Sequence, residues 1–313
     1  MTKHTPIPNP SGKNGSLLER ADKAFALDGL GPANVPGDLP APKPRPKAPA
    51  APTALKPEQA PEAPAEPRVE LNGPSVAIDR ETLRDNGLIV PEDPVTGLLE
   101  EFRIIKREIL AGARRSRSGA SRRVLLSSPH EGEGKTFCAA NLAISLSTER
   151  DIEVVLVDAD VMSPSITSVF GIEEGPGFMD ALAVPSQHPE DLAIATDIDG
   201  LFIMPAGNRS ARDTEYLASS RTHEVLERLT RGAPNRIVIF DTPPALGASP
   251  AAELAAHVGQ ALLVVRADET SRAAIDDAQQ LLSACPDLKL LLNAAKFSPS
   301  GRRFGNYRQG DNP

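Results

Sequence analysis

The chain has 313 residues and a formal net charge of −8, and it contains no tryptophan and only two tyrosines. A typical domain holds roughly 150 residues, so this length permits one large or two ordinary domains. The acidic balance and the scarcity of aromatic side chains argue against a nucleic-acid-binding protein, which needs a basic surface and stacking platforms. We therefore expect no nucleic-acid partner.

The two cysteines, Cys138 and Cys285, lie in apolar stretches. They indicate reduced core thiols in a cytoplasmic protein, because thiols stay reduced in that compartment, and a disulfide between them is the less favoured alternative. No apolar run approaches the 18 residues of a membrane span, and the N-terminus lacks the hydrophobic middle of a signal peptide. The sequence therefore predicts no membrane span of its own.

Residues 1–75 are predicted to form a disordered arm rich in proline and alanine. Many of the 31 prolines lie in this part of the chain, at a density that packed helices and sheets do not tolerate. One short helix is expected near residues 16–28, where Ser16 and Glu19 form a capping-box pattern. It is either a transient helix in a tether or a docking helix that orders on a partner.

Residues 76–123 are predicted to form a helical segment followed by a basic linker. Apolar residues recur at helical spacing over residues 94–112, with charged residues on the remaining surface. The arginines between Arg114 and Arg123 form either a solvated linker or an electrostatic contact with an anionic surface.

From residue 124 onward, short apolar runs alternate with helical patterns. We expect strands at Val124–Ser128, Val154–Asp158, Leu201–Pro205, Arg236–Asp241, Ala261–Arg266 and Leu288–Asn293. Helices are expected near residues 135–149, 213–231, 249–258 and 270–284. This alternation predicts an α/β domain over residues 124–296, with a doubly wound, mostly parallel sheet, and residues 297–313 are predicted to form a flexible basic tail.

The first predicted strand leads into a loop, Ser127–Thr136, that has the features of a phosphate loop. Gly132 and Gly134 allow backbone N–H groups to curl around phosphate oxygens at the start of a helix. Lys135 reaches the terminal phosphates, and the hydroxyl of Thr136 suits Mg²⁺. Pro129 replaces the usual leading glycine of this motif.

Two further strands end in carboxylates. Asp158 and Asp160 follow one apolar strand, and Asp241 ends another. In such sheets, ligands bind beyond the carboxyl ends of the strands. These carboxylates are therefore candidates for holding Mg²⁺ and for accepting a proton.

Together the three motifs resemble those of the bacterial tyrosine kinases of capsule and exopolysaccharide loci, the BY-kinases, and especially the cytoplasmic autokinases associated with exosortase clusters. Residues 100–107, 204–207, 214–219 and 292–293 are also similar to that family, so the resemblance covers about residues 78–296. It implies a P-loop NTPase fold and an ATP-dependent protein-tyrosine autokinase that regulates exopolysaccharide chain length or export.

The resemblance also implies roles for individual residues. The phosphoryl-transfer residues would be Lys135, Asp158 and Asp160, and the ligands of Mg²⁺ would be Thr136, Asp160 and Asp241. The ATP-binding residues would be Gly132, Glu133, Gly134, Lys135, Thr136, Phe137 and Asn293. Asn293 would contact adenine, and the alternative for this residue is that it caps a loop.

The base that accepts the tyrosine proton is either Asp158 or Asp160. Tyr307, in the predicted flexible tail, is the expected phosphoacceptor, whereas Tyr216 lies in a helical pattern and is expected to be packed.

The family's signature helix packs subunits into rings, and here Glu100, Arg103 and Lys106 occupy its positions. A homo-oligomeric ring is therefore expected. The resemblance also implies an inner-membrane polysaccharide copolymerase, or chain-length determinant, as the partner that recruits this cytoplasmic chain to the membrane.

The sequence departs from the family in its second motif and its tail. Val161, Met162 and Ser163 follow Asp160 where the family usually has arginine, and the tail carries one tyrosine instead of a cluster. Two alternative functions remain open. One is a partitioning-type ATPase, although His130 stands where that class has a second lysine. The other is an ATP-binding adaptor without transfer activity.

Overall fold

The structure is a computed structural model that describes residues 66–116 and 118–295. All of them belong to one unit of the chain that begins at Glu62. The predicted helix near residues 16–28 and the tail with Tyr307 lie outside the described residues, and their predictions stay untested.

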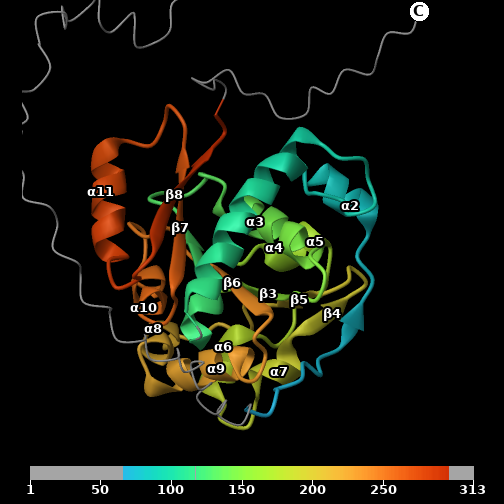
Figure 1. Cartoon of the computed structure of the whole chain (residues 1–313). Coiled ribbons are helices and arrows are strands. Elements are labelled where there is room, and N and C mark those ends of the chain that lie inside the picture. The colour runs from blue at the N-terminus through green and yellow to red at the C-terminus, as the bar shows by residue number, and fades with distance from the viewer. Residues whose placement is uncertain (1–65, 117, 296–313) are drawn as a thin grey trace, which may run out of the picture. The chain divides into compact units, whose positions relative to one another are not determined.

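An eight-stranded sheet forms the centre of this unit, in the order β1-β4-β5-β3-β6-β2-β7-β8 (Figure 1). Only β4 and β5 pair in antiparallel fashion, and all other neighbours are parallel. The strands are β1 Ser75–Val76, β2 Arg123–Ser127, β3 Glu153–Asp158, β4 Ile194–Thr196, β5 Leu201–Met204, β6 Arg236–Asp241, β7 Gln260–Arg266 and β8 Leu288–Asn293. The predicted α/β class with a mostly parallel sheet is confirmed.

Helices cover both faces of the sheet, as Figure 1 shows. One face packs against α2 Arg80–Asp85, α3 Gly97–Arg115, α4 Lys135–Ser147 and α5 Ile166–Phe170. The other packs against α6 Phe178–Ala183, α8 Asp213–Leu217, α9 Ser220–Thr230, α10 Pro250–Ala255 and α11 Arg272–Leu281. The short helix α7 Pro189–Leu192 lies before β4, and a 3₁₀ turn, Gly119–Arg122, leads into β2. Among the described residues, none of these helices has both the length and the apolar character needed to cross a bilayer.

The central strand β2 shows why the strands are apolar along their whole length. Val124 and Leu126 pack on the side of α3 and α4, whereas Leu125 packs on the opposite side, and all three are fully buried. Side chains alternate between the faces of a strand, so a sheet covered on both faces requires apolar residues at every position.

The segment before β2 is part of this fold. Val76 pairs with Thr196 across β1 and β4, and the Ile89 N–H donates to Asn141 Oδ1 on α4 at 2.8 Å. Phe102 and Ile109 of α3 are buried against the sheet. The helix predicted over residues 94–112 is thus α3, and its apolar face packs within this chain.

Two local predictions differ from the structure. The helix expected over residues 213–231 is two helices, α8 and α9, because Ser219 between them has an extended backbone, with φ −83° and ψ 160°. Thr222 Oγ1, in the first turn of α9, donates to the carbonyls of Tyr216 and Leu217 at 3.0 and 2.9 Å. The second difference concerns Arg123, the last arginine of the expected basic linker, which is not exposed to solvent. Arg123 is buried, pairs with Glu227 and donates to the His257 carbonyl at 2.9 Å.

Candidate functional site

The phosphate loop joins β2 to α4 at the carboxyl edge of the sheet. Gly132 and Gly134 have φ angles of +77° and +92°, in the left-handed region that favours glycine. Gly134 is also the N-cap of α4 and offers no side chain to the first N–H groups of the helix. These N–H groups are therefore available to an anion, as phosphate binding at a helix start requires.

Residues from the ends of β7 and β8 hold this loop from one side. The Glu133 carboxylate accepts hydrogen bonds from His130 N at 3.0 Å and from Thr270 Oγ1 at 2.5 Å. Asn293 Nδ2 donates to the Glu133 carbonyl at 2.8 Å, and Arg266 donates to the Gly132 carbonyl at 3.1 Å. The side chain of Glu133 thus fixes the loop's shape.

Sequence reasoning missed Arg266 and Thr270. One feature of the sequence could have indicated Arg266: the apolar run of β7 ends at this charged residue, at the same edge of the sheet as the phosphate loop.

The two residues predicted to hold Mg²⁺ from β6 and α4 lie together. Thr136 Oγ1 donates to Asp241 Oδ2 at 2.6 Å and lies 3.2 Å from Ser165 Oγ, a hydroxyl that the sequence did not single out. Asp241 is fully buried, and its other oxygen, Oδ1, has no hydrogen-bond partner. Burial raises the pKa of Asp241 to about 7, although Lys135 and the Thr136 hydroxyl favour the ionised form.

This arrangement fits a magnesium ion. A buried carboxylate oxygen without a hydrogen-bond partner destabilises the folded protein, and a bound cation would remove this cost. Hydroxyl and carboxylate oxygens are also the ligands that Mg²⁺ prefers. Within residues 66–116 and 118–295, no group of three His, Cys, Asp or Glu side chains could hold a metal alone. Phosphate oxygens would therefore have to supply further ligands, as is usual for Mg²⁺.

Lys135 and Asp160 form an ion pair in which Nζ lies 2.7 Å from Oδ2. Burial lowers the pKa of Lys135, but the nearby carboxylates of Asp241 and Asp160 outweigh burial and raise it. Lys135 is therefore held as a cation at the phosphate loop.

Asp158 and Asp160 have different surroundings, although they are two residues apart. Asp158 is fully buried, and its oxygens accept the backbone N–H groups of Asp160, Ser165 and Ile166 at 3.1, 2.8 and 2.9 Å. Burial raises the pKa of Asp158 to about 6 against the effect of these donors. Asp158 therefore holds the loop after β3 in place, whereas Asp160 borders an open cavity.

That cavity has a volume of about 320 Å³ and lies directly beside the phosphate loop. Its polar lining comprises Glu131, Lys135, Asp160, Ser163 and Ser165, and Met162, Pro243 and Pro244 supply apolar lining. A site of this kind can bind phosphate at one end and a partly apolar group at the other.

Two predicted ATP-binding residues take other contacts in this structure. The Asn293 amide bonds to the loop carbonyl described above, and an added Cβ on Gly134 would meet its Nδ2 at 2.1 Å. Phe137 packs against the core on the side of α3, and its carbonyl accepts Asn141 Nδ2 at 3.0 Å. A contact between Asn293 and adenine stays a prediction.

Of the three residues predicted to join subunits, Lys106 is placed differently from the expectation. Its side chain is buried and donates to the Ser145 carbonyl at 3.0 Å and to Thr148 Oγ1 at 3.2 Å, with Glu149 at 2.8 Å. It therefore caps the C-terminal end of α4 in its own chain. Glu100 and Arg103, which are partly exposed, pair with each other.

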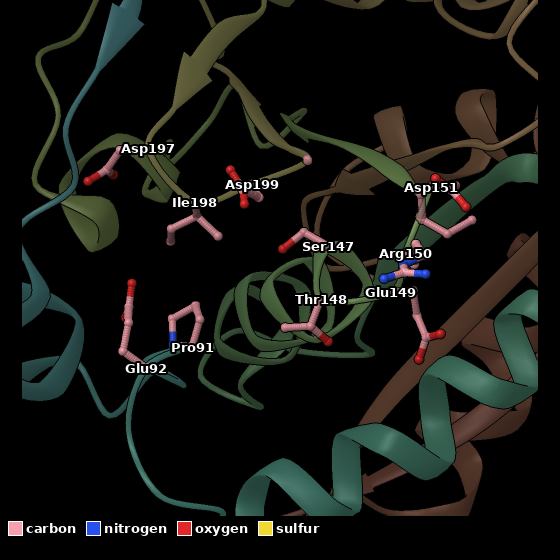
Figure 2. A pocket seen from close by; sticks show the side chains of 12 residues that line it. Pro91, Glu92, Ser147, Thr148, Glu149, Arg150, Asp151, Asp197, Ile198 and Asp199 are labelled. Carbon is pink, nitrogen blue, oxygen red and sulfur yellow. The ribbon is translucent and has the colours of Figure 1, made fainter.

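A larger cavity of about 540 Å³ lies at the opposite end of α4, as Figure 2 shows. Most of its charged side chains are acidic: Glu92, Glu149, Asp151, Asp197 and Asp199. Anionic walls beside the negative end of a helix disfavour a polyphosphate. The smaller cavity, beside the phosphate loop, is therefore the better candidate for binding a polyphosphate.

Comparison with known proteins agrees with this geometry. A ParA family model, described as an NUBPL iron-transfer P-loop NTPase, matches residues 119–290, which is more than half of the chain. The chain belongs to this P-loop NTPase family. The match covers the phosphate loop and both acidic strand ends.

Similar proteins within the P-loop NTPases carry tyrosine-kinase names. EpsB of Ralstonia solanacearum, provisionally named a tyrosine-protein kinase, is 30% identical over 227 residues, which cover 70% of this chain and 29% of EpsB. The tyrosine-protein kinase YwqD of Bacillus subtilis is 27% identical over 237 residues, which cover 75% of this chain and 96% of YwqD. The predicted resemblance to the bacterial tyrosine kinases is confirmed.

A solved structure supports the fold. The kinase domain of the Escherichia coli tyrosine kinase ETK superposes with a TM-score of 0.54 at 21% identity, over 74% of this chain and 93% of that domain. At this identity the likeness concerns the fold alone.

Proposed function

We propose that the chain is an ATP- and Mg²⁺-dependent protein-tyrosine autokinase that regulates exopolysaccharide chain length or export. The observation that carries the proposal is the convergence of Lys135, Asp160, Thr136 and Asp241 at the phosphate loop, beside a cavity with room for an acceptor. The tyrosine-kinase names of EpsB and YwqD support the choice of phosphoryl acceptor.

ATP would lie with its phosphates on the N–H groups of residues 132–137, and Thr136 and Asp241 would hold Mg²⁺. The ion, when bound, would neutralise charge on the phosphate oxygens. Lys135 would stabilise the negative charge that develops on the transferred phosphoryl group. Asp241 would remain ionised beside these cations despite its raised pKa.

The phosphoryl acceptor would be a tyrosine hydroxyl in the cavity beside Asp160. A bond forms between the phenolic oxygen and the γ-phosphorus, the bond from the γ-phosphorus to the β–γ bridging oxygen breaks, and ADP leaves with that oxygen. We assign the phenolic proton to Asp160, because Asp160 lines the cavity whereas Asp158 does not.

Tyr307 is the proposed acceptor within this chain. The other tyrosine, Tyr216, is partly buried and packs against the core. We further propose that the chain assembles into a ring and acts with an inner-membrane polysaccharide copolymerase, as the family resemblance implies.

The test is incubation of the purified full chain with ATP and Mg²⁺, followed by phosphotyrosine detection and mass-spectrometric mapping. We expect phosphate on Tyr307 in the wild type, and none in the Lys135→Met and Tyr307→Phe variants. Phosphate on Tyr216 alone would contradict the choice of acceptor. ATP hydrolysis without any phosphotyrosine would contradict the kinase and favour the partitioning-type ATPase.

A further inference from the structure

The cavity beside the phosphate loop has an apolar wall that the predicted placement of ATP leaves without an occupant. Met162 is 61% exposed, although it is a large apolar residue, and it lies two residues after Asp160. Pro243 and Pro244 line the same cavity. Phosphate and Mg²⁺ make no use of a thioether or of proline rings, and adenine is predicted to lie at Asn293, which does not line this cavity.

The backbone fixes the position of Met162. Residues 160–163 form a turn in which Ser163 N donates to the Asp160 carbonyl at 3.2 Å and to Asp160 Oδ1 at 3.0 Å. Val161, inside this turn, is 2% exposed and packs into the core. Asp160 is thus held toward Lys135, Val161 is held in the core, and Met162 is left at the cavity.

The proline wall is also held by the phosphate loop. Ser127 Oγ donates to the Pro243 carbonyl at 2.8 Å, and Ala245 N donates to the Ser128 carbonyl at 2.7 Å. The backbone of both walls is therefore held by hydrogen bonds, which lowers the entropy cost of binding a rigid group.

We propose that Met162 is a specificity-determining residue that packs against the ring of the acceptor tyrosine, with Pro243 and Pro244 on the other side of that ring. This inference rests on the proposed kinase function and names a residue that selects the acceptor. An aromatic ring is flat and apolar and carries its hydroxyl at the far end, so it can contact both walls while the hydroxyl reaches Asp160. A serine or threonine hydroxyl has no such body to fill the gap.

The thioether suits this contact for a second reason. Sulfur against an aromatic ring contributes about 0.3–1.5 kcal/mol, which corresponds to roughly a twofold to tenfold change in affinity.

The test separates ring binding from phosphoryl transfer. The receptor is the full chain with Tyr307→Leu, so that its own tail does not compete, in the presence of Mg²⁺ and a non-hydrolysable ATP analogue. The probes are fluorescent peptides of residues 301–313 with tyrosine, phenylalanine, leucine or serine at position 307. We expect the two aromatic peptides to bind about twofold to tenfold more tightly than the other two, as measured by fluorescence anisotropy.

Substitutions at Met162 then assign the preference. Met162→Gln keeps the length of the side chain but removes the apolar contact, and it should abolish the preference for aromatic peptides. Met162→Leu keeps an apolar side chain but lacks the sulfur, so it should retain only part of the preference. Leu281→Ala removes another exposed apolar side chain that does not line the cavity, and it should retain the full preference. In the same Tyr307→Leu background, with ATP and Mg²⁺, Met162→Gln should raise KM for the tyrosine peptide while KM for ATP stays unchanged.

Equal binding of the four peptides, or a preference that persists in Met162→Gln, would overturn the inference. An absence of detectable binding by the tyrosine peptide would overturn it as well. If aromatic peptides bind selectively but no phosphotyrosine forms, the kinase proposal fails while the role of Met162 in ring binding stands.

Discussion

Replacing Lys106 by methionine distinguishes a role within the chain from a role between subunits. The Lys106 ammonium is buried at the end of α4, where it contacts the Ser145 carbonyl, Thr148 Oγ1 and Glu149 within 3.2 Å. Hydrogen bonds to charged groups contribute about 1.5–3 kcal/mol, and a cation at a helix C-terminus adds about 0.3–1 kcal/mol. Methionine preserves the packing of the stem but none of these contacts.

We expect Lys106→Met to lower the free energy of unfolding by about 1–3 kcal/mol in urea titrations. The lower end applies because the Ser145 carbonyl also accepts Thr148 Oγ1 at 2.8 Å, and because Glu149 is 43% exposed and can be hydrated. The matched control is Arg103→Met, whose partly exposed pair with Glu100 should change stability by less than about 1 kcal/mol.

The ion pair between Lys106 and Glu149 predicts that stability depends on pH. Lys106 lowers the pKa of Glu149 through their hydrogen bond. A lowered carboxylate pKa contributes stability above the unfolded value, and this contribution is lost as the pH falls through the folded value. The difference in stability between wild type and Lys106→Met should therefore narrow in acid.

Sedimentation velocity on both variants completes the experiment. If Lys106→Met has the same urea midpoint of unfolding as the wild type but sediments as a smaller species, the capping role is wrong. Lys106 would then join subunits, as the family resemblance implied.

Three further predictions concern the site and the core. In the absence of nucleotide, Asp241→Asn should raise the free energy of unfolding at pH 8 by up to about 4 kcal/mol. The reason is that burial raises the pKa of Asp241 to about 7, so the ionised carboxylate destabilises the wild type above that pH. If urea titrations show that the variant is stabilised over the wild type no more at pH 8 than at pH 5, this prediction is wrong. Thr270→Val removes the hydroxyl that holds Glu133 and should weaken binding of a fluorescent ATP analogue several-fold with little loss of stability; unchanged affinity would show that the loop keeps its shape alone. Both cysteines, Cys138 and Cys285, are buried, and burial raises the pKa of each thiol, that of Cys138 to about 12. Both thiols should therefore react with Ellman's reagent only after unfolding. Rapid reaction of the native protein would contradict their buried placement.

The sheet could be predicted wherever both faces of a strand are buried. Strands β3, β6 and β7 are apolar along four or more consecutive residues, and such runs stand out from the helices between them. Strands β1 and β4 were missed because they have two and three residues and are partly exposed, so no periodic pattern can develop. Their pairing depends on contacts over more than 100 residues of sequence.

The site could be predicted in part because of the same topology. Strands β3, β6 and β2 are neighbours, so residues at their carboxyl ends, including Asp160, Asp241 and Thr136, come together at one edge. The residues that hold the phosphate loop from β7 were not predictable. Thr270 and Glu133 are far apart in sequence, and neither residue alone indicates the other.

Lys106 shows how residue type and helical periodicity can disagree. A lysine at the third position of a charged signature suggests an exposed contact, as Glu100 and Arg103 do. At about 100° per residue, however, Lys106 falls about 40° from Phe102 and about 60° from Ile109 around α3, and both of these residues are buried. The periodicity therefore directs Lys106 toward α4, where a long cation is tolerated because the helix end supplies carbonyl acceptors. Because α4 begins at Lys135 and ends where Lys106 binds, α3 contacts the far end of the helix that carries the phosphate loop.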